Sequence, residues 1–225
     1  MVRRTVTLLL GFLLGLAIFL PLQDAGDRIL EKLGREPSAQ TYARRGLTAY
    51  GRGSLDQAIV NLQAAIAKNP KDATARYALA QALESAGRLK EATAELLRVV
   101  EAAPELAAPH YNLAVLYQVQ GRRDLQEEEL KRALEIEPEF TGAHLLLGNF
   151  YFKEGRPDEA LAEYNRVADS AYLRPPEEVA LLTNRGEIYL AKGQRALAAA
   201  DWQKALEIDP QDKALREKLR SLQGK

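Results

Sequence analysis

Apolar positions follow two patterns along this chain, a continuous run near the start and a periodic arrangement after it. Residues 5–23 contain no charged side chain. A helix of that length rises roughly 28 Å at about 1.5 Å per residue, which matches the hydrocarbon core of a bilayer. Arg3 and Arg4 precede the run and Asp24 follows it. Because basic residues favour the cytoplasmic side, we predict a cytoplasmic N-terminus at 1–4 and a single transmembrane signal anchor at 5–23. The rest of the chain would then be extracytoplasmic (periplasmic, if the protein is bacterial).

Three other interpretations of the apolar run stay open. The first is a cleaved signal peptide, because Gly15 and Ala17 are small residues of the kind found at cleavage sites. The second is a buried helix of a soluble domain. The third is an anchor of reversed orientation, which only two basic charges oppose. Gly11 and Gly15 also form a pair of small residues four apart, through which two anchor helices could dimerise.

A short linker at 24–38 separates this run from the periodic part. Ile29, Leu30 and Leu33 share one face of a helical spacing, and Gly34 would end that helix. The pattern predicts a short amphipathic helix. It would lie on the membrane surface or pad the first helices of the periodic part, and the sequence leaves both open.

From residue 39 onward, apolar positions recur at helical spacing in blocks of about 34 residues, each with a glycine at its fifteenth position and most with a proline at its thirty-second. The period is marked by Gly53, Gly87, Gly121 and Gly155, by Pro70, Pro104 and Pro138, and, after four additional residues, by Gly193 and Pro210. Glycine suits a tight turn and proline ends a helix. Each block is therefore predicted to be a helix, a turn and a second helix, and the blocks are 39–72, 73–106, 107–140, 141–178 and 179–212, followed by a capping helix and C-terminus at 213–225.

This periodic pattern resembles the tetratricopeptide repeat family, whose unit is a 34-residue helix pair. Small residues stand at the eighth and twentieth positions of four blocks: Gly46 and Ala58, Ala80 and Ala92, Gly148 and Ala160, Gly186 and Ala198. The resemblance implies an all-α chain, in which an N-terminal transmembrane helix is followed by an α-solenoid of five helix pairs and a capping helix. No pair buries its apolar face alone, so neighbouring pairs are expected to stack.

Two blocks depart from the pattern. The third has Gln126 at its twentieth position, where we expect a local adjustment. The fourth carries four additional residues within 170–178, which would form a longer proline-bearing loop or an extra helical turn. Tyr172 and Leu173 in that segment would either contact a partner or fold back onto neighbouring helices.

Composition and motifs argue against catalysis. The chain has 31 basic and 31 acidic residues and no cysteine, which excludes disulfides and thiolate metal sites and disfavours nucleic-acid binding. His110 and His144 are one period apart, too far to share a metal ion, and the run Glu127–Glu129 fits a solvated face. We therefore predict no enzyme activity, no cofactor, no metal and no nucleic-acid partner.

What remains is binding of a protein or peptide. In this family the first helices of successive units line a concave groove, and the resemblance implies the following peptide-binding residues: Arg44, Tyr50, Tyr77, Gln81, Tyr111, Asn112, Gln118, Asn149, Phe152 and Asn184. The predicted function is a membrane-tethered adaptor that acts in assembly, maturation or quality control of membrane or envelope protein complexes. The alternative is a constitutive structural subunit of one membrane complex.

Overall fold

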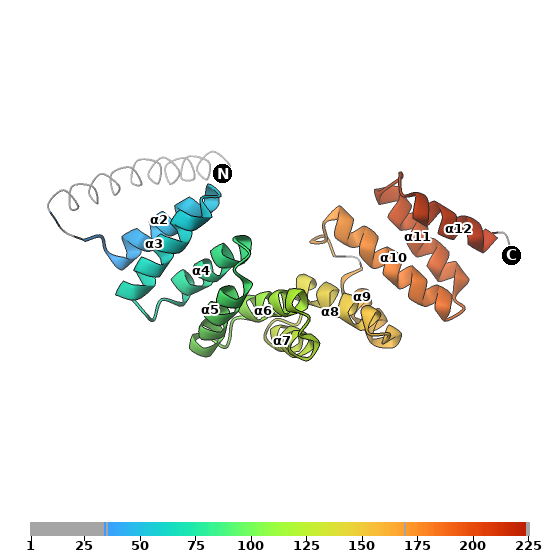
Figure 1. Ribbon diagram of the computed structural model, residues 1–225. Coiled ribbons are helices and arrows are strands. Elements are labelled where there is room, and N and C mark those ends of the chain that lie inside the picture. The colour runs from blue at the N-terminus through green and yellow to red at the C-terminus, as the bar shows by residue number, and fades with distance from the viewer. Residues whose placement is uncertain (1–33, 35, 169, 224–225) are drawn as a thin grey trace, which may run out of the picture. The chain divides into compact units, whose positions relative to one another are not determined.

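The computed structural model describes residue 34, residues 36–168 and residues 170–223 of the chain. These ranges contain eleven α-helices, α2 to α12, and no strand (Figure 1). The all-α prediction is therefore confirmed for the described part of the chain. None of these helices is both long and apolar enough to cross a bilayer. The predicted anchor at 5–23, its glycine pair and the predicted linker helix lie outside the described residues.

The described helices divide into two compact units, the first ending at Ala102 and the second beginning at Ala103. The first unit contains α2 (Ala39–Gly51), α3 (Leu55–Lys68), α4 (Ala73–Ser85) and α5 (Leu89–Ala102). Helices α2 and α3 form one antiparallel pair and α4 and α5 the next, and α3 packs against α4. Leu62, Leu83 and Leu96 are among the side chains that this packing buries completely or nearly so.

The second unit contains α6 (Ala107–Gln120), α7 (Arg123–Ile136), α8 (Thr141–Lys153), α9 (Pro157–Val167), α10 (Pro175–Ala191), α11 (Arg195–Ile208) and α12 (Lys213–Gln223). Three antiparallel pairs follow one another, and α12 packs against α11. One continuous apolar core runs through the unit and includes Tyr164, Trp202 and Leu215. The burial of Leu215 on α12 fits the predicted role of this helix as a cap over the last pair.

The two helices of a pair are joined by a tight turn that contains a glycine with positive φ. Gly121, for example, has a φ of 71°. The next amide, that of Arg122, donates to the Tyr117 carbonyl at 2.9 Å and so closes the end of α6. A side chain at Gly121 would be strained whatever space surrounds it. The other four turns contain glycines with φ values between 70° and 75°, namely Gly53, Gly87, Gly155 and Gly193.

Within a pair, the helices approach closely because a small residue faces a large one. A Cβ atom built on Gly46, Gly148 or Gly186 would lie 2.6, 2.7 or 2.4 Å from Leu62, Tyr164 or Trp202. Those three large residues all stand at the twenty-fourth position of their blocks. The sequence pointed to the twentieth position, where Ala58, Ala92, Ala160 and Ala198 are indeed fully buried, but it missed the twenty-fourth. Where the eighth position is Ala80 or Ala114, the twenty-fourth is Leu96 or Leu130.

The four additional residues of the fourth block lengthen α10. This helix begins at Pro175 and has 17 residues, whereas α8 has 13. Of the two forms that the sequence left open, the structure shows the extra helical turn, preceded by the segment 170–174. Leu173 packs against the core of the second unit, whereas Tyr172 is 87% exposed. Leu173 therefore folds back onto neighbouring helices, whereas a partner contact by the exposed Tyr172 stays a prediction. Gln126 is buried within an uninterrupted α7.

Candidate peptide-binding site

The second unit contains a pocket of about 680 Å³ between its first helices. Helices α6 and α8, the turn before α8, the segment 170–174 and the first turn of α10 supply its walls. The lining residues are Tyr111, Glu137, Glu139, Phe140, Thr141, Gly142, Leu145, Leu146, Asn149, Tyr172, Leu173 and Glu177. Its volume lies in the range of about 300–1,000 Å³ that is typical of ligand-binding pockets.

One wall of the pocket is aromatic. The rings of Tyr111 on α6 and Phe140 at the start of α8 lie 5.0 Å apart between centroids and are tilted by 41°. Both side chains are half-buried and pack against the core of the unit. Such a tilted pair has a fixed geometry and a large apolar area, so the wall offers a rigid surface to an apolar side chain.

Three acidic residues, the acidic rim, line the pocket. Glu137 and Glu139 are exposed on the turn that leads into α8. Glu177, at the start of α10, accepts from the backbone amide of Arg174 at 3.0 Å and pairs with its guanidinium. These two interactions with Arg174 hold the pKa of the Glu177 carboxyl below its usual value. Arg174 offsets Glu177, whereas Glu137 and Glu139 have no ion pair among the residues that the structure describes.

The structure brings two of the predicted groove residues, Tyr111 and Asn149, into this pocket. Asn149 also takes part in a hydrogen-bond network that joins three helices. Its side-chain oxygen accepts from the Tyr164 hydroxyl at 2.7 Å and from the Asn184 amide at 3.2 Å. Burial raises the pKa of the Tyr164 phenol to about 12. Asn184, predicted as a ligand contact, therefore has internal partners that hold α10 against α8 and α9.

The other predicted groove residues lie elsewhere. Gln118 lines a separate pocket of about 200 Å³, together with Phe150 and Lys153. Phe152 packs partly into the core, and Asn112 is half-buried on α6. Four further predicted residues, Arg44, Tyr50, Tyr77 and Gln81, are half-buried on α2 and α4 of the first unit. The Tyr50 hydroxyl lies 3.3 Å from the Ser85 hydroxyl. A binding role for these ten residues stays a prediction.

Sequence reasoning missed Phe140, Leu146 and the acidic rim. All three features depend on which connection between repeats borders a pocket. The 34-residue period cannot show this, because it predicts the same connection in every repeat. The four additional residues were the available signal, since they drew attention to Tyr172 and Leu173, which form one side of the opening.

A second group of polar residues lies largely buried between the two helices of three of the five pairs, at the same positions of the repeat. Arg76 pairs with Glu95 at 2.9 Å in the first unit, and His144 pairs with Glu163 at 2.6 Å in the second. His110 and Glu129 form the equivalent pair, also at 2.6 Å. In these three pairs the base is at the fourth position and the acid at the twenty-third, so the contacts lock the two helices of a pair together.

The interpretation of Glu127–Glu129 as a solvated face is wrong for two of its three residues. Only Glu128 is exposed. Glu129 pairs with His110, and Glu127 accepts from Tyr151 at 3.2 Å and from Arg156 at 3.0 Å. A helix face that packs against its neighbours retains acidic residues when each carboxylate has a basic or hydroxyl partner.

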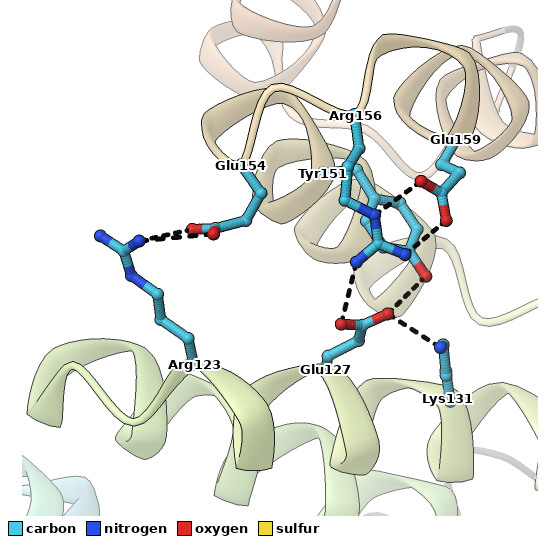
Figure 2. A network of polar contacts seen from close by, with 7 residues as sticks. All are labelled: Arg123, Glu127, Lys131, Tyr151, Glu154, Arg156 and Glu159. Atoms are coloured by element: carbon cyan, nitrogen blue, oxygen red, sulfur yellow. Dashed lines mark hydrogen bonds and ion pairs between the residues drawn. The ribbon is translucent and has the colours of Figure 1, made fainter.

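Figure 2 shows the network around Glu127, which joins α7 to the pair α8 and α9. Lys131 adds an ion pair at 2.8 Å, and the Arg156 guanidinium stacks 4.2 Å from the centre of the Tyr151 ring. Partial burial acts to raise the pKa of the Glu127 carboxyl, but the hydrogen bonds from Lys131 and Arg156 outweigh it and lower the pKa. The network therefore connects adjacent helix pairs. Within the described ranges, no cluster of three or more metal-ligating side chains occurs.

The His144 pair gives the second unit a pH-dependent contribution to stability. His144 Nδ1 faces the Glu163 carboxylate and its Nε2 lies 2.8 Å from the Pro138 carbonyl. A carboxylate and a carbonyl only accept, so the cationic imidazole, with both ring nitrogens protonated, satisfies both contacts. The Glu163 hydrogen bond is the main cause that raises the pKa of His144, while burial and Arg166 act in the opposite direction.

Because this pKa is raised on folding, the stabilisation is fully present below about pH 6.5, the value in an unfolded chain, and is lost as the pH rises through the folded value. We expect the difference in unfolding free energy between the wild type and Glu163→Gln to shrink across that window. Urea unfolding at several pH values measures this difference. A difference that grows with pH would contradict the assignment of charge.

Comparison with known proteins agrees with this helix-pair architecture. A family profile described as tetratricopeptide repeat matches residues 49–116 and 127–185, more than half of the chain. Two further profiles with the same description match residues 107–140 and 179–212. This chain belongs to the tetratricopeptide repeat family. The family resemblance predicted from the sequence is thereby confirmed.

Solved tetratricopeptide repeat structures share the fold. The crystal structure of YrrB, described as a repeat protein with an unusual peptide-binding site, superposes with a TM-score of 0.68 at 23% identity, over 86% of this chain and 96% of that one. The crystal structure of MamA gives 0.66 at 22% identity, over 76% and 92%. TTC0263, a repeat protein from Thermus thermophilus, gives 0.54 at 25% identity, over 82% and 98%. No curated protein sequence matches this chain.

Proposed function

We propose that this tetratricopeptide repeat protein is a non-enzymatic adaptor that binds a segment of another protein on the first helices of its pairs. The observation that carries the proposal is the pocket on α6, α8 and α10, which combines an aromatic wall with leucine and acidic side chains. Protein interfaces are commonly anchored by aromatic residues set in a desolvated pocket.

We further propose that residues 5–23 tether the adaptor to a membrane, with the repeats on the extracytoplasmic side. The uncharged run and the preceding pair Arg3 and Arg4 support this orientation. A tether would raise the local concentration of the adaptor near membrane-bound partners, so that modest contacts would suffice. Assembly, maturation or quality control of membrane protein complexes fits such an arrangement.

Affinity capture of the full chain from solubilised membranes identifies the partner and tests the binding surface. Replacing Tyr77, Tyr111 and Asn112 together is expected to reduce recovery of specific partners about tenfold or more. A matched control replaces Val60 and Leu197 by alanine. They are 64% and 48% exposed on second helices, so recovery should not change. If the triple variant keeps its partners while circular dichroism shows it folded, the binding surface lies elsewhere.

A reporter fused after Lys225 tests the orientation. We expect activity from a reporter that folds only outside the cytoplasm and none from one that works only inside it. N-terminal sequencing of the membrane-bound protein separates an intact anchor from a cleaved signal peptide. Activity of the cytoplasm-only reporter would overturn the proposed orientation without affecting the proposed binding surface.

A further inference from the structure

The pocket of the second unit has a chemistry of its own, and we infer from it the kind of segment that it binds. We propose that this pocket accepts a partner segment in which a bulky apolar side chain is next to a lysine or arginine. The inference rests on the proposed adaptor function and adds the class of ligand and the residues that select it. Four features support this ligand class: the apolar wall, a helical glycine, the acidic rim and the lengthened α10.

The interior of the pocket is suited to an apolar side chain. Leu145 and Leu146 on α8 and Leu173 on the segment 170–174 are only partly buried, and they extend the aromatic wall of Tyr111 and Phe140. Tyr172 stands at the edge with 87% of its surface exposed. A volume of about 680 Å³ is larger than one side chain, so an apolar residue and part of its backbone would enter together. Burial of such a residue gives the main favourable contribution.

Gly142 keeps the pocket open. It lies in the first turn of α8, and a Cβ atom built on it would be 3.4 Å from the Phe140 ring and 3.5 Å from the Tyr111 ring. Those are ordinary contact distances, and Gly142 is not among the glycines with positive φ. Neither packing nor backbone conformation therefore requires glycine here. Glycine is also the poorest helix former after proline, so the stability of α8 does not explain it either. A larger side chain at this position would project over the two rings and fill the pocket.

The rim selects the charge of the segment. Glu137 and Glu139 lie in the connection between α7 and α8, and both are exposed. Glu177 also lines the pocket, and Arg174 already pairs with it. Two carboxylates within a short distance of an apolar cavity attract a cationic side chain and disfavour an acidic one. An apolar anchor with an adjacent lysine or arginine matches both features at once.

The pocket belongs to one repeat junction because the lengthened α10 helps to build it. Tyr172, Leu173 and Glu177 all lie in the segment 170–178, where the fourth block carries its four additional residues. Blocks of ordinary length lack four of these residues, so their first helices begin without the extra turn. The ligand preference is therefore a property of this junction and not of the repeat as such.

Selection from a displayed library of random heptapeptides, with the full chain in lipid nanodiscs as bait, tests the inference. We expect the enriched peptides to combine a bulky apolar residue with a neighbouring lysine or arginine. Fluorescence anisotropy of one enriched peptide then gives the affinities of the variants. Gly142→Leu should weaken binding about tenfold or more by filling the pocket. The matched control Val119→Leu, at a residue of α6 that is 65% exposed and does not line the pocket, should stay within about twofold.

The charge contribution has its own variant. Glu137→Gln combined with Glu139→Gln should weaken binding roughly threefold at low salt, with the difference fading at high salt because the carboxylates are exposed. Urea unfolding of each variant shows that it remains folded.

Three results would overturn the inference: no enrichment, enrichment of acidic peptides, or binding that Gly142→Leu leaves intact. If capture of partners from membranes still depends on Tyr77, Tyr111 and Asn112 in any of those cases, the adaptor function stands and only the ligand class is wrong.

Discussion

Replacing Arg185 by methionine is expected to lower the unfolding free energy of the second unit by about 3–5 kcal/mol, as when one partner of a buried ion pair is removed. The Arg185 guanidinium donates to both carboxylate oxygens of Asp201 at 2.7 Å. Only 14% of the Arg185 side chain and 9% of the Asp201 side chain are exposed. Methionine keeps much of the aliphatic volume but leaves the carboxylate without its counter-charge in a site of low dielectric. Urea unfolding followed by circular dichroism measures the loss.

A double variant distinguishes lost pairing from lost packing. Adding Asp201→Leu to Arg185→Met should recover most of the stability, because a buried pair replaced by apolar residues of similar volume is often nearly neutral. The exposed pair of Lys192 and Asp158, with 37% and 80% of the side chains accessible, provides the control. There Lys192→Met should change stability by roughly 0–1 kcal/mol. A double variant that loses the sum of the single losses would show that the pair itself contributes little.

Replacing Gly186 by alanine is the second large effect that we expect. Its Cβ atom would lie 2.4 Å from the Trp202 indole nitrogen and 2.7 Å from a ring carbon. Trp202 is 1% exposed, and its nitrogen donates to the Thr183 carbonyl at 3.2 Å, so the ring has little freedom to move away. Overpacking of this kind costs about 1–3 kcal/mol. Thermal and urea unfolding of Gly186→Ala should both show the loss.

The chain itself indicates how the loss could be reversed. Ala114 and Leu130 occupy the positions in the third block that Gly186 and Trp202 occupy in the fifth, and both are fully buried. Combining Gly186→Ala with Trp202→Leu should therefore be less destabilising than the two single losses added together. Gly142→Ala is the control for alanine in a helix, since its contacts are ordinary. A double variant that is strictly additive would show that the two positions do not interact.

Much of the fold follows from the period alone. Glycines and prolines at a fixed spacing of 34 predict the turns and helix ends, and the apolar positions between them predict which faces are buried. Leu113, Leu116 and Leu130, for example, recur at helical spacing and are completely buried. The period predicts the buried faces because every block must bury one apolar face against its neighbours.

The candidate site could be predicted only in part, for physical reasons. Tyr111 and Asn149 follow from the positions of first helices, but the acidic rim depends on the path of one particular turn. The buried pair of His144 and Glu163 joins residues 19 apart on two helices, so no local pattern reveals it. The sequence shows that Glu127 and Glu129 are charged, and charge alone predicts a surface position. Partners of both lie on other helices and become known only from the packing.

The match of small and large residues within each pair has a consequence for how such a chain diversifies. Gly186 on α10 leaves room for Trp202 on α11. The residue types at these two positions must therefore match. A segment exchanged between repeats keeps that fit only if both helices travel together. Placing α4, with Ala80 at the corresponding position, in front of α11 would set a methyl group against Trp202. The unit of exchange is therefore the whole hairpin, and recombination breakpoints are best tolerated in the connections between hairpins.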